Sequence, residues 1–240
     1  MEKNRLYNFI QKYYLNGLVE GTKIHVRDNK ITTDFITEDR STLGHITYNN
    51  IDIEDTTFGV YDTSQLVRML NVLDNDVEVN IVKVSDKPVN MKMQSKSGTQ
   101  VTALLADLSV IPDVPVMKKI PEFGLKFEVD QNFVGMYAKS KTALPETDTF
   151  TIVPDEHSTK LVLGMSNVNT NRISLPLSDV TLDDPLLENK TLNANVFKEV
   201  LSVNKDTKAT VELAEAGLLR ISYSDKDYTA TYFLKTIENE

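Results

Sequence analysis

The sequence contains no cysteine among its 240 residues, which excludes disulfide bonds, thiolate metal sites and cysteine nucleophiles. Long apolar runs are also missing, because no stretch approaches the roughly 20 apolar residues that a membrane-spanning helix needs. The first residues, MEKNRLYNFIQKYYLNG, contain neither an uninterrupted apolar segment nor a small-residue cleavage site, so they do not resemble a secretion signal. Together these absences predict a soluble protein of the cytoplasm.

Catalytic motifs are absent as well. Glycine occurs only nine times, and the sequence has neither a glycine-rich phosphate loop nor a GxSxG nucleophile motif. The three histidines, His25, His45 and His157, fall on separate expected strands or loops without HExxH spacing. Asp155-Glu156-His157 is a possible metal cluster, but three adjacent polar residues between strands more often form a turn. We therefore expect no enzymatic activity, no bound metal and no cofactor.

The overall charge is acidic. The chain has 35 Asp and Glu against 26 Lys and Arg, which gives a formal net charge of −9. A nucleic-acid-binding domain is usually basic, so this balance argues against that role. The argument fails if the basic residues gather on one surface and the acidic residues on another.

A helical pattern is repeated in the two halves of the chain. Residues 66–72 and 197–203 both place apolar side chains at the i, i+3, i+4 spacing of an amphipathic helix. Each segment follows a residue, Asp62 or Asn193, whose side-chain oxygen can cap the free amides of a first helical turn. The aligned apolar pairs are Leu66 with Phe197, Met69 with Val200, Leu70 with Leu201 and Val72 with Val203.

The surrounding elements repeat in the same order. Each half should begin with another helix, with the apolar positions Leu6, Phe9, Ile10 and Tyr13 in the first half and Phe133, Met136 and Tyr137 in the second. Alternating runs predict strands at 22–26, 30–34, 45–48, 51–53, 149–153, 160–165 and 172–177, with Asp28-Asn29 as a hairpin turn. Paired strands should then follow at 77–79 and 211–213, 89–93 and 218–222, and 99–105 and 228–234. This order, given twice, predicts an α+β protein with two similar domains, each with two helices packed on antiparallel sheets.

An extended segment separates the two halves. We expect domains at 1–107 and 122–240, joined by a linker at 108–121 in which three prolines oppose regular secondary structure. Solvated linkers are normally polar, whereas this one carries Ile111, Val114, Val116 and Met117. These side chains either pack against the domains or form a docking site for a partner.

The expected helices are polar to basic on the faces opposite their apolar residues. At about 100° per residue, the outward positions include Asn8, Gln11, Ser64, Asn71, Asn195 and Ser202. The cations expected on these faces or at the helix ends are Arg5, Lys12, Arg68, Lys139, Lys141, Lys198 and Lys205, with Glu199 as the main acidic exception. Lysine and arginine are common on the exposed faces of helices. The same excess of polar and basic residues on four helices nevertheless favours a surface that contacts DNA phosphates and does not read the bases.

The repeated order and the linker together resemble the PCNA-type sliding clamps. Phe58-Gly59-Val60-Tyr61-Asp62, followed by Leu66 to Leu70 and then Val72-Leu73-Asp74-Asn75-Asp76-Val77-Glu78, is most similar to the shorter clamps of large T-even-type tailed bacteriophages. The resemblance implies a DNA-clamp fold whose subunits close into a homotrimeric ring around double-stranded DNA, with the helices lining the hole. It implies that strands near 99–106 and 172–177 join neighbouring subunits, and that an ATP-dependent clamp loader opens the ring.

The same resemblance assigns roles to the residues named above. The seven cations would face DNA without sequence specificity, and Ile111, Val114, Val116 and Met117 would receive a peptide from DNA polymerase or the loader. The protein would then be a DNA polymerase accessory protein that confers processivity on replication. The alternative is a phage structural or adhesion protein with no DNA role, since acidic, cysteine-free, strand-rich chains are common in virions.

Overall fold

The computed structural model describes residues 2–155, 158–165, 170–183 and 187–237. The chain divides into two compact units. The first contains Met1–Pro115 with Asp225–Ala230, and the second contains Val116–Ser224 with Thr231–Glu240. Within the described ranges, no helix is long and apolar enough to cross a membrane.

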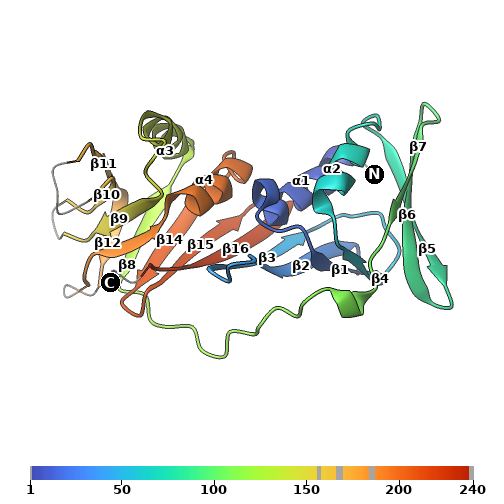
Figure 1. The fold of residues 1–240 in the computed structure, drawn as a ribbon, viewed down its shortest axis with the longest axis horizontal. Coiled ribbons are helices and arrows are strands. Elements are labelled where there is room, and N and C mark those ends of the chain that lie inside the picture. The colour runs from blue at the N-terminus through green and yellow to red at the C-terminus, as the bar shows by residue number, and fades with distance from the viewer. Residues whose placement is uncertain (1, 156–157, 166–169, 184–186, 238–240) are drawn as a thin grey trace. The chain divides into compact units, whose positions relative to one another are not determined.

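The first unit packs two helices against antiparallel strands (Figure 1). Its elements are α1 (Lys3–Tyr14), η1 (Leu15–Gly17), β1 (Thr22–Arg27), β2 (Lys30–Ile36), β3 (Thr42–Tyr48), β4 (Thr56–Val60), α2 (Thr63–Leu70), β5 (Val77–Val84), β6 (Lys87–Ser95), β7 (Gln100–Leu104) and η2 (Leu108–Val110). Strands run in the spatial order β3–β2–β1–β4, and β5–β6–β7 form a separate three-stranded sheet.

The second unit repeats this plan with more strands. Its elements are β8 (Leu125–Val129), α3 (Gln131–Ala143), β9 (Thr149–Val153), β10 (Lys160–Leu163), β11 (Ile173–Pro176), β12 (Ser178–Leu182), β13 (Lys190–Asn193), α4 (Ala194–Val203), β14 (Ala209–Ala214), β15 (Leu218–Ser224) and β16 (Tyr228–Lys235). Strands run in the orders β12–β8–β14–β15–β16 and β11–β10–β9–β13. The fold class expected from the sequence, an α+β protein with two similar domains and antiparallel sheets, is confirmed.

Local signals in the sequence account for several element boundaries. Asp28 and Asn29 both have positive φ, 51° and 58°, and form the predicted two-residue turn between Arg27 and Lys30. Asp62 accepts a hydrogen bond from the amide of Gln65, and Asn193 accepts from the amides of Asn195 and Val196. Both predicted helix caps are therefore confirmed.

Two local predictions are wrong. Residues 51–53 form no strand, although Ile51 and Ile53 are buried, because Asn50 turns the chain with φ 56° and the next strand begins only at Thr56. Val72 is 65% exposed, since α2 ends at Leu70 and the helical periodicity no longer applies. Burial of apolar side chains alone did not distinguish an irregular segment from a strand.

A buried tyrosine ties the paired helices together in each unit. The Tyr13 hydroxyl lies 3.3 Å from the Thr63 hydroxyl at the start of α2, and the Tyr137 hydroxyl donates to the Ala194 carbonyl at the start of α4, 3.0 Å away. Burial raises the pKa of both phenols, so they remain neutral hydrogen-bonding groups. The equivalent contacts hold one face of each helix pair inward and leave the other face to solvent.

Candidate functional site

The four α-helices are nearly free of carboxylates. They span 12, 8, 13 and 10 residues and contain one acidic side chain, that of Glu199. About one residue in seven of the whole chain is Asp or Glu, so some six would be expected on this length of helix. The helices therefore form the part of an acidic protein that is best suited to lie near a polyanion.

Arg5 is on α1 but is engaged in structure. Its guanidinium lies 2.5 Å from the Asp227 carboxylate and 3.4 Å from the backbone carbonyls of Asn49 and Asn50. The Asn49 amide also donates to the Asp227 carbonyl, at 2.8 Å. Arg5 thus holds the segment Asp225–Ala230 on the first unit.

Lys12 departs from the predicted position. The helical projection expected a solvated cation, but the side chain is only 6% exposed and its amino group lies 4.1 Å from the centroid of the Tyr228 ring. Tyr228 in turn stacks on Tyr48, with ring centroids 5.2 Å apart. A cation over an aromatic face is stabilised by the ring quadrupole, which explains why this lysine turns inward. The expectation that Lys12 is solvated is wrong.

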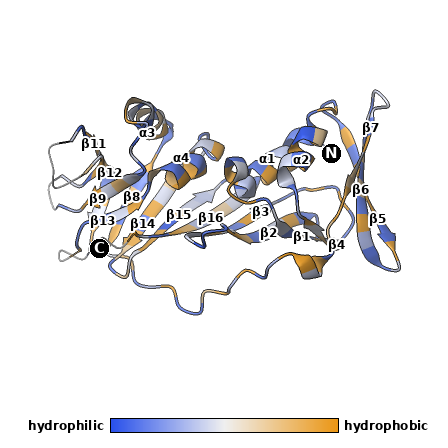
Figure 2. Cartoon of the chain, viewed as in Figure 1, coloured by the Kyte–Doolittle hydropathy of each residue, from blue (hydrophilic) through white to orange (hydrophobic). Residues whose placement is uncertain are grey.

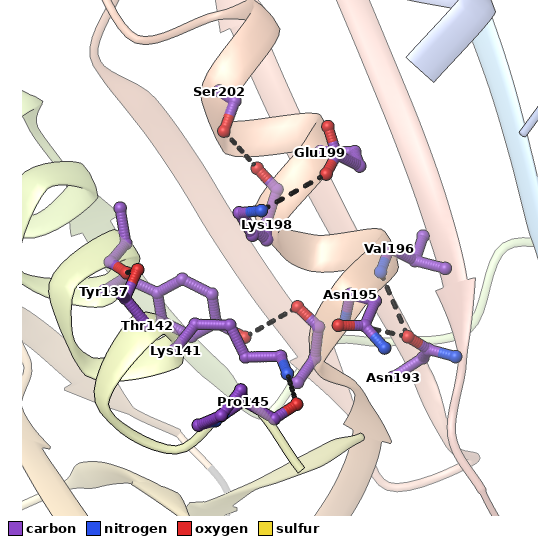
Figure 3. A network of polar contacts seen from close by, with 12 residues as sticks. Tyr137, Lys141, Thr142, Pro145, Asn193, Asn195, Val196, Lys198, Glu199 and Ser202 are labelled. Carbon is purple, nitrogen blue, oxygen red and sulfur yellow. Dashed lines mark hydrogen bonds and ion pairs between the residues drawn. The ribbon is translucent and has the colours of Figure 1, made fainter. Parts of the chain in front are cut away.

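Lys141 is withdrawn from solvent in a similar way (Figure 3). It is 7% exposed and its amino group donates to the Pro145 carbonyl, 2.9 Å away, just beyond the end of α3. A cation at a helix C-terminus satisfies a free carbonyl and interacts favourably with the helix dipole. The sequence placed Lys141 just beyond an outward lysine and gave no sign of this bond.

Four of the predicted cations remain accessible. Arg68 on α2, Lys139 on α3 and Lys205 after α4 are exposed and form no ion pair with any described residue. Lys198 on α4 is about half exposed and lies 3.6 Å from Glu199, as Figure 3 shows. These four side chains are the ones that can reach an external anion.

Uncharged amides occupy much of the remaining helical surface. The exposed or half-exposed amide side chains on the helices or at their ends are Asn4, Asn8, Gln11, Gln65, Asn71, Gln131, Asn132, Asn193 and Asn195. Asn132 and Asn195 are paired with Asp130 and Asp148, at 3.5 Å and 3.0 Å. The sequence projection found Asn8, Gln11, Asn71 and Asn195 but treated them as secondary to the cations.

The four apolar residues proposed for docking lie in different environments. Ile111 is buried at 4% exposure, Val114 and Met117 are partly exposed, and Val116 is 87% exposed. Ile111 packs on Gly59, where an added methyl group would approach the Ile111 side chain to 2.7 Å. The segment is extended after η2 and mixes hydrophobic with hydrophilic residues (Figure 2).

Two hollows flank this segment within the first unit. The larger, about 800 Å³, is lined by Leu18, Ile36, Arg40, Tyr61, Ile111 and Pro115. The smaller, about 300 Å³, contains Val114 together with His25 and Asp34. Lys23 on β1 pairs with Asp113 between them and fixes the segment to the sheet. Exposed Tyr61 and Leu18 make the larger hollow suited to an apolar side chain.

β7 and β11 each stand at the end of a sheet and leave one edge open. Thr99 and Leu105, the residues that flank β7, bond to β6, so the backbone groups of Gln100, Thr102 and Leu104 point away from that neighbour. In β11, Leu177 bonds toward β10, so Ser174 and Pro176 point outward, and Pro176 offers no amide hydrogen. Leu104 is 86% exposed on its edge. Open edges of this kind invite pairing with another chain.

No group of His, Asp and Glu suited to a metal ion occurs in the described ranges. Of the possible cluster Asp155-Glu156-His157, the last two residues lie outside the described part of the chain. Asp155 accepts a bond from the Ser158 amide, as in a turn.

The duplicated helix–sheet architecture defines the DNA-clamp fold, the class of fold found in PCNA. A solved structure of PCNA from A. fulgidus, bound to the C-terminal region of FEN-1, matches with a TM-score of 0.77 and 16% sequence identity. The match covers 100% of this chain and 98% of that chain. No family model and no curated protein sequence matches. The likeness therefore establishes the fold.

Proposed function

We propose that the protein is a sliding clamp of the PCNA type, a non-catalytic homotrimeric ring that encircles duplex DNA and tethers a DNA polymerase to it. The carboxylate-poor helices carry this proposal, because they give an acidic protein one surface that a polyanion can approach. A topological tether does not need tight binding, so few free cations suffice. The phage clamps of T-even type are the proposed relatives, which would place the protein in the cytoplasm of an infected cell.

The open strand edges support the ring. We assign β7 of one protomer to pair with β11 of the next, which would cover the exposed Leu104 and satisfy the outward backbone groups of both strands. The domains at 1–107 and 122–240 and the linker at 108–121 would then be the repeating parts of the ring. Light scattering at tens of micromolar protein should give the mass of a trimer, and a monomer would contradict this assembly.

The linker is the proposed docking site for polymerase or for an ATP-dependent loader. The larger hollow beside Ile111 supports this role, since it combines exposed apolar side chains with the fixed wall of the linker. Leu18→Asp with Tyr61→Asp, which changes two exposed side chains that line this hollow, should abolish polymerase stimulation and leave the ring intact. Normal processive synthesis by this variant would show that the docking site lies elsewhere.

The DNA-facing surface is tested by charge reversal at accessible positions only. Arg68→Glu, Lys139→Glu and Lys198→Glu place three reversed charges in each subunit, and repulsion from phosphates should shorten retention on circular DNA at least tenfold. Lys12 is unsuitable for this test because it is buried, so its reversal would disturb the fold. The control reverses Lys30, Lys92 and Lys126, which are exposed on β2, β6 and β8 and form no ion pair with any described residue. Equal retention of both variants would contradict the assignment.

A further inference from the structure

The helical surface of the first unit is an amide surface. On α1, Asn4, Asn8 and Gln11 project within an arc of about 60°, so they form one ridge along the helix. Gln65 on α2 and Asn71, which caps the C-terminus of α2, lie three residues before and three residues after Arg68. None of these five amide side chains forms a hydrogen bond within the described ranges.

The cations of the same helices are almost all committed elsewhere. Lys3 donates to the Leu73 carbonyl at 2.6 Å, Arg5 pairs with Asp227, and Lys12 lies over Tyr228. Only Arg68 among the described helical cations of this unit is exposed without a protein partner. The helices α1 and α2 therefore present several amide donors and acceptors, and one free cation, Arg68, that have no partner among the described residues.

We infer that the α1–α2 face holds the sugar–phosphate backbone of the duplex mainly through uncharged amide hydrogen bonds, while the lysines of α3 and α4 supply the charge-dependent contacts. This inference rests on the proposed function and specifies how that surface works. Neither α1 nor α2 contains a carboxylate, and the nearby carboxylates of Glu2, Asp62 and Glu20 lie at the N-terminal ends of the helices, which leaves the rest of the face open to a polyanion. Amide side chains donate to phosphate oxygens and to bridging water without releasing counterions.

The two kinds of contact differ in their dependence on salt. Each cation that neutralises a phosphate contributes a slope of about −0.9 to the logarithm of affinity against the logarithm of salt concentration. An amide contact contributes affinity and friction but no slope. Removing amides from α1 and α2 should therefore weaken the hold on DNA without changing its salt dependence.

A run-off measurement separates these effects. Diluted protein can be mixed with a nicked circular duplex and then concentrated, so that rings of the proposed trimer assemble around the DNA without a loader. The trapped rings are then released by cutting the circle once, and their run-off rate is followed over a series of salt concentrations. The variant Asn8→Ala with Gln65→Ala should run off at least twofold faster than wild type, with an unchanged salt slope. Alanine is the better helix former, so this variant should stay folded.

The control is Asn80→Ala with Gln94→Ala, which removes one Asn and one Gln from exposed strand positions of the same unit and should leave run-off unchanged. Arg68→Ala should instead reduce the magnitude of the salt slope. The inference is overturned if the α1–α2 variant runs off at the wild-type rate, or if it changes the slope as Arg68→Ala does. If wild type is retained no better on circular than on linear DNA, the proposed function itself fails, and this inference fails with it.

Discussion

The two helical layers have the same construction and different surfaces. In each, a buried tyrosine of the first helix reaches the start of the second, yet the first unit engages three of its four described helical cations, leaves only Arg68 free in solvent and exposes amides. The second unit keeps Lys139, Lys198 and Lys205 in solvent and buries only Lys141. The architecture therefore constrains the inward face of a helix pair and leaves the chemistry of its outward face free to diverge.

The largest effect should come from the aromatic side chain of Tyr228, which packs against Lys12 and Tyr48 in the first unit. Tyr228 is 5% exposed and contacts both Lys12 and Tyr48, so Tyr228→Ala should lower the free energy of unfolding by about 3–5 kcal/mol. Tyr228→Phe keeps both ring contacts and should lose less than half as much. Denaturant titration of the two variants measures the difference, and equal losses would show that the hydroxyl rather than the ring matters.

How much of this could be predicted from the sequence depends on how local each signal is. The Asp62 and Asn193 caps and the Asp28-Asn29 turn are contacts within a few residues, so composition and spacing were enough. The helical periodicity also located α1 and α4, because one face of each helix is buried. The order of the elements was sufficient for the fold class.

The positions and partners of the Lys12 and Arg5 side chains could not be predicted in the same way. Their partners, Tyr228 and Asp227, lie more than 200 residues away in sequence, and no pattern within α1 points to them. A helical projection assigns every lysine opposite the apolar stripe to solvent. It does not show that an aromatic ring far away in the sequence can contact such a lysine and bury it. The distinction between amide and cation surfaces therefore required the tertiary structure.

Matched lysines provide a second test of the difference between the layers. Lys12→Ala removes a buried stem and a cation–π contact, and it should cost about 1–2 kcal/mol of stability. Lys139→Ala changes an exposed side chain and should stay within about 0.5 kcal/mol of wild type. Thermal or denaturant unfolding would decide, and similar values for both would mean that Lys12 gains nothing from its burial.

A glycine on the outward side of α3 should have a smaller, opposite effect. An added Cβ at Gly135 would meet no atom within 4 Å, so Gly135→Ala should stabilise the second unit by about 0.5–1 kcal/mol through helix propensity. At Gly44 in the first unit the same change would bring Cβ to 2.2 Å from the Phe35 ring and should destabilise. If Gly135→Ala also destabilises, the space around Gly135 must be occupied by something other than the residues of the same chain.

The smallest expected effect is the pH dependence contributed by a histidine pair in the first unit. His45 on β3 lies 2.7 Å from Asp34 on β2, whereas no described residue of the second unit is a histidine. Their hydrogen bond raises the pKa of His45 above 6.5 and lowers the pKa of Asp34 below 3.8, with His25 adding to the shift at Asp34. The His45 contribution is fully present below pH 6.5 and is lost as pH rises through its folded-state pKa, while the Asp34 contribution is lost as pH falls below 3.8.

Both side chains are at least half exposed, so solvent screening limits the pair to about 0.5 kcal/mol. His45→Gln should therefore cost this amount at a pH of about 5.5 and almost nothing at about 8.5, because neutral histidine keeps no ion pair to lose. Urea titrations of wild type and variant at the two pH values measure the change. A larger deficit at the higher pH would reverse the sign and show that His45 acts through packing rather than charge.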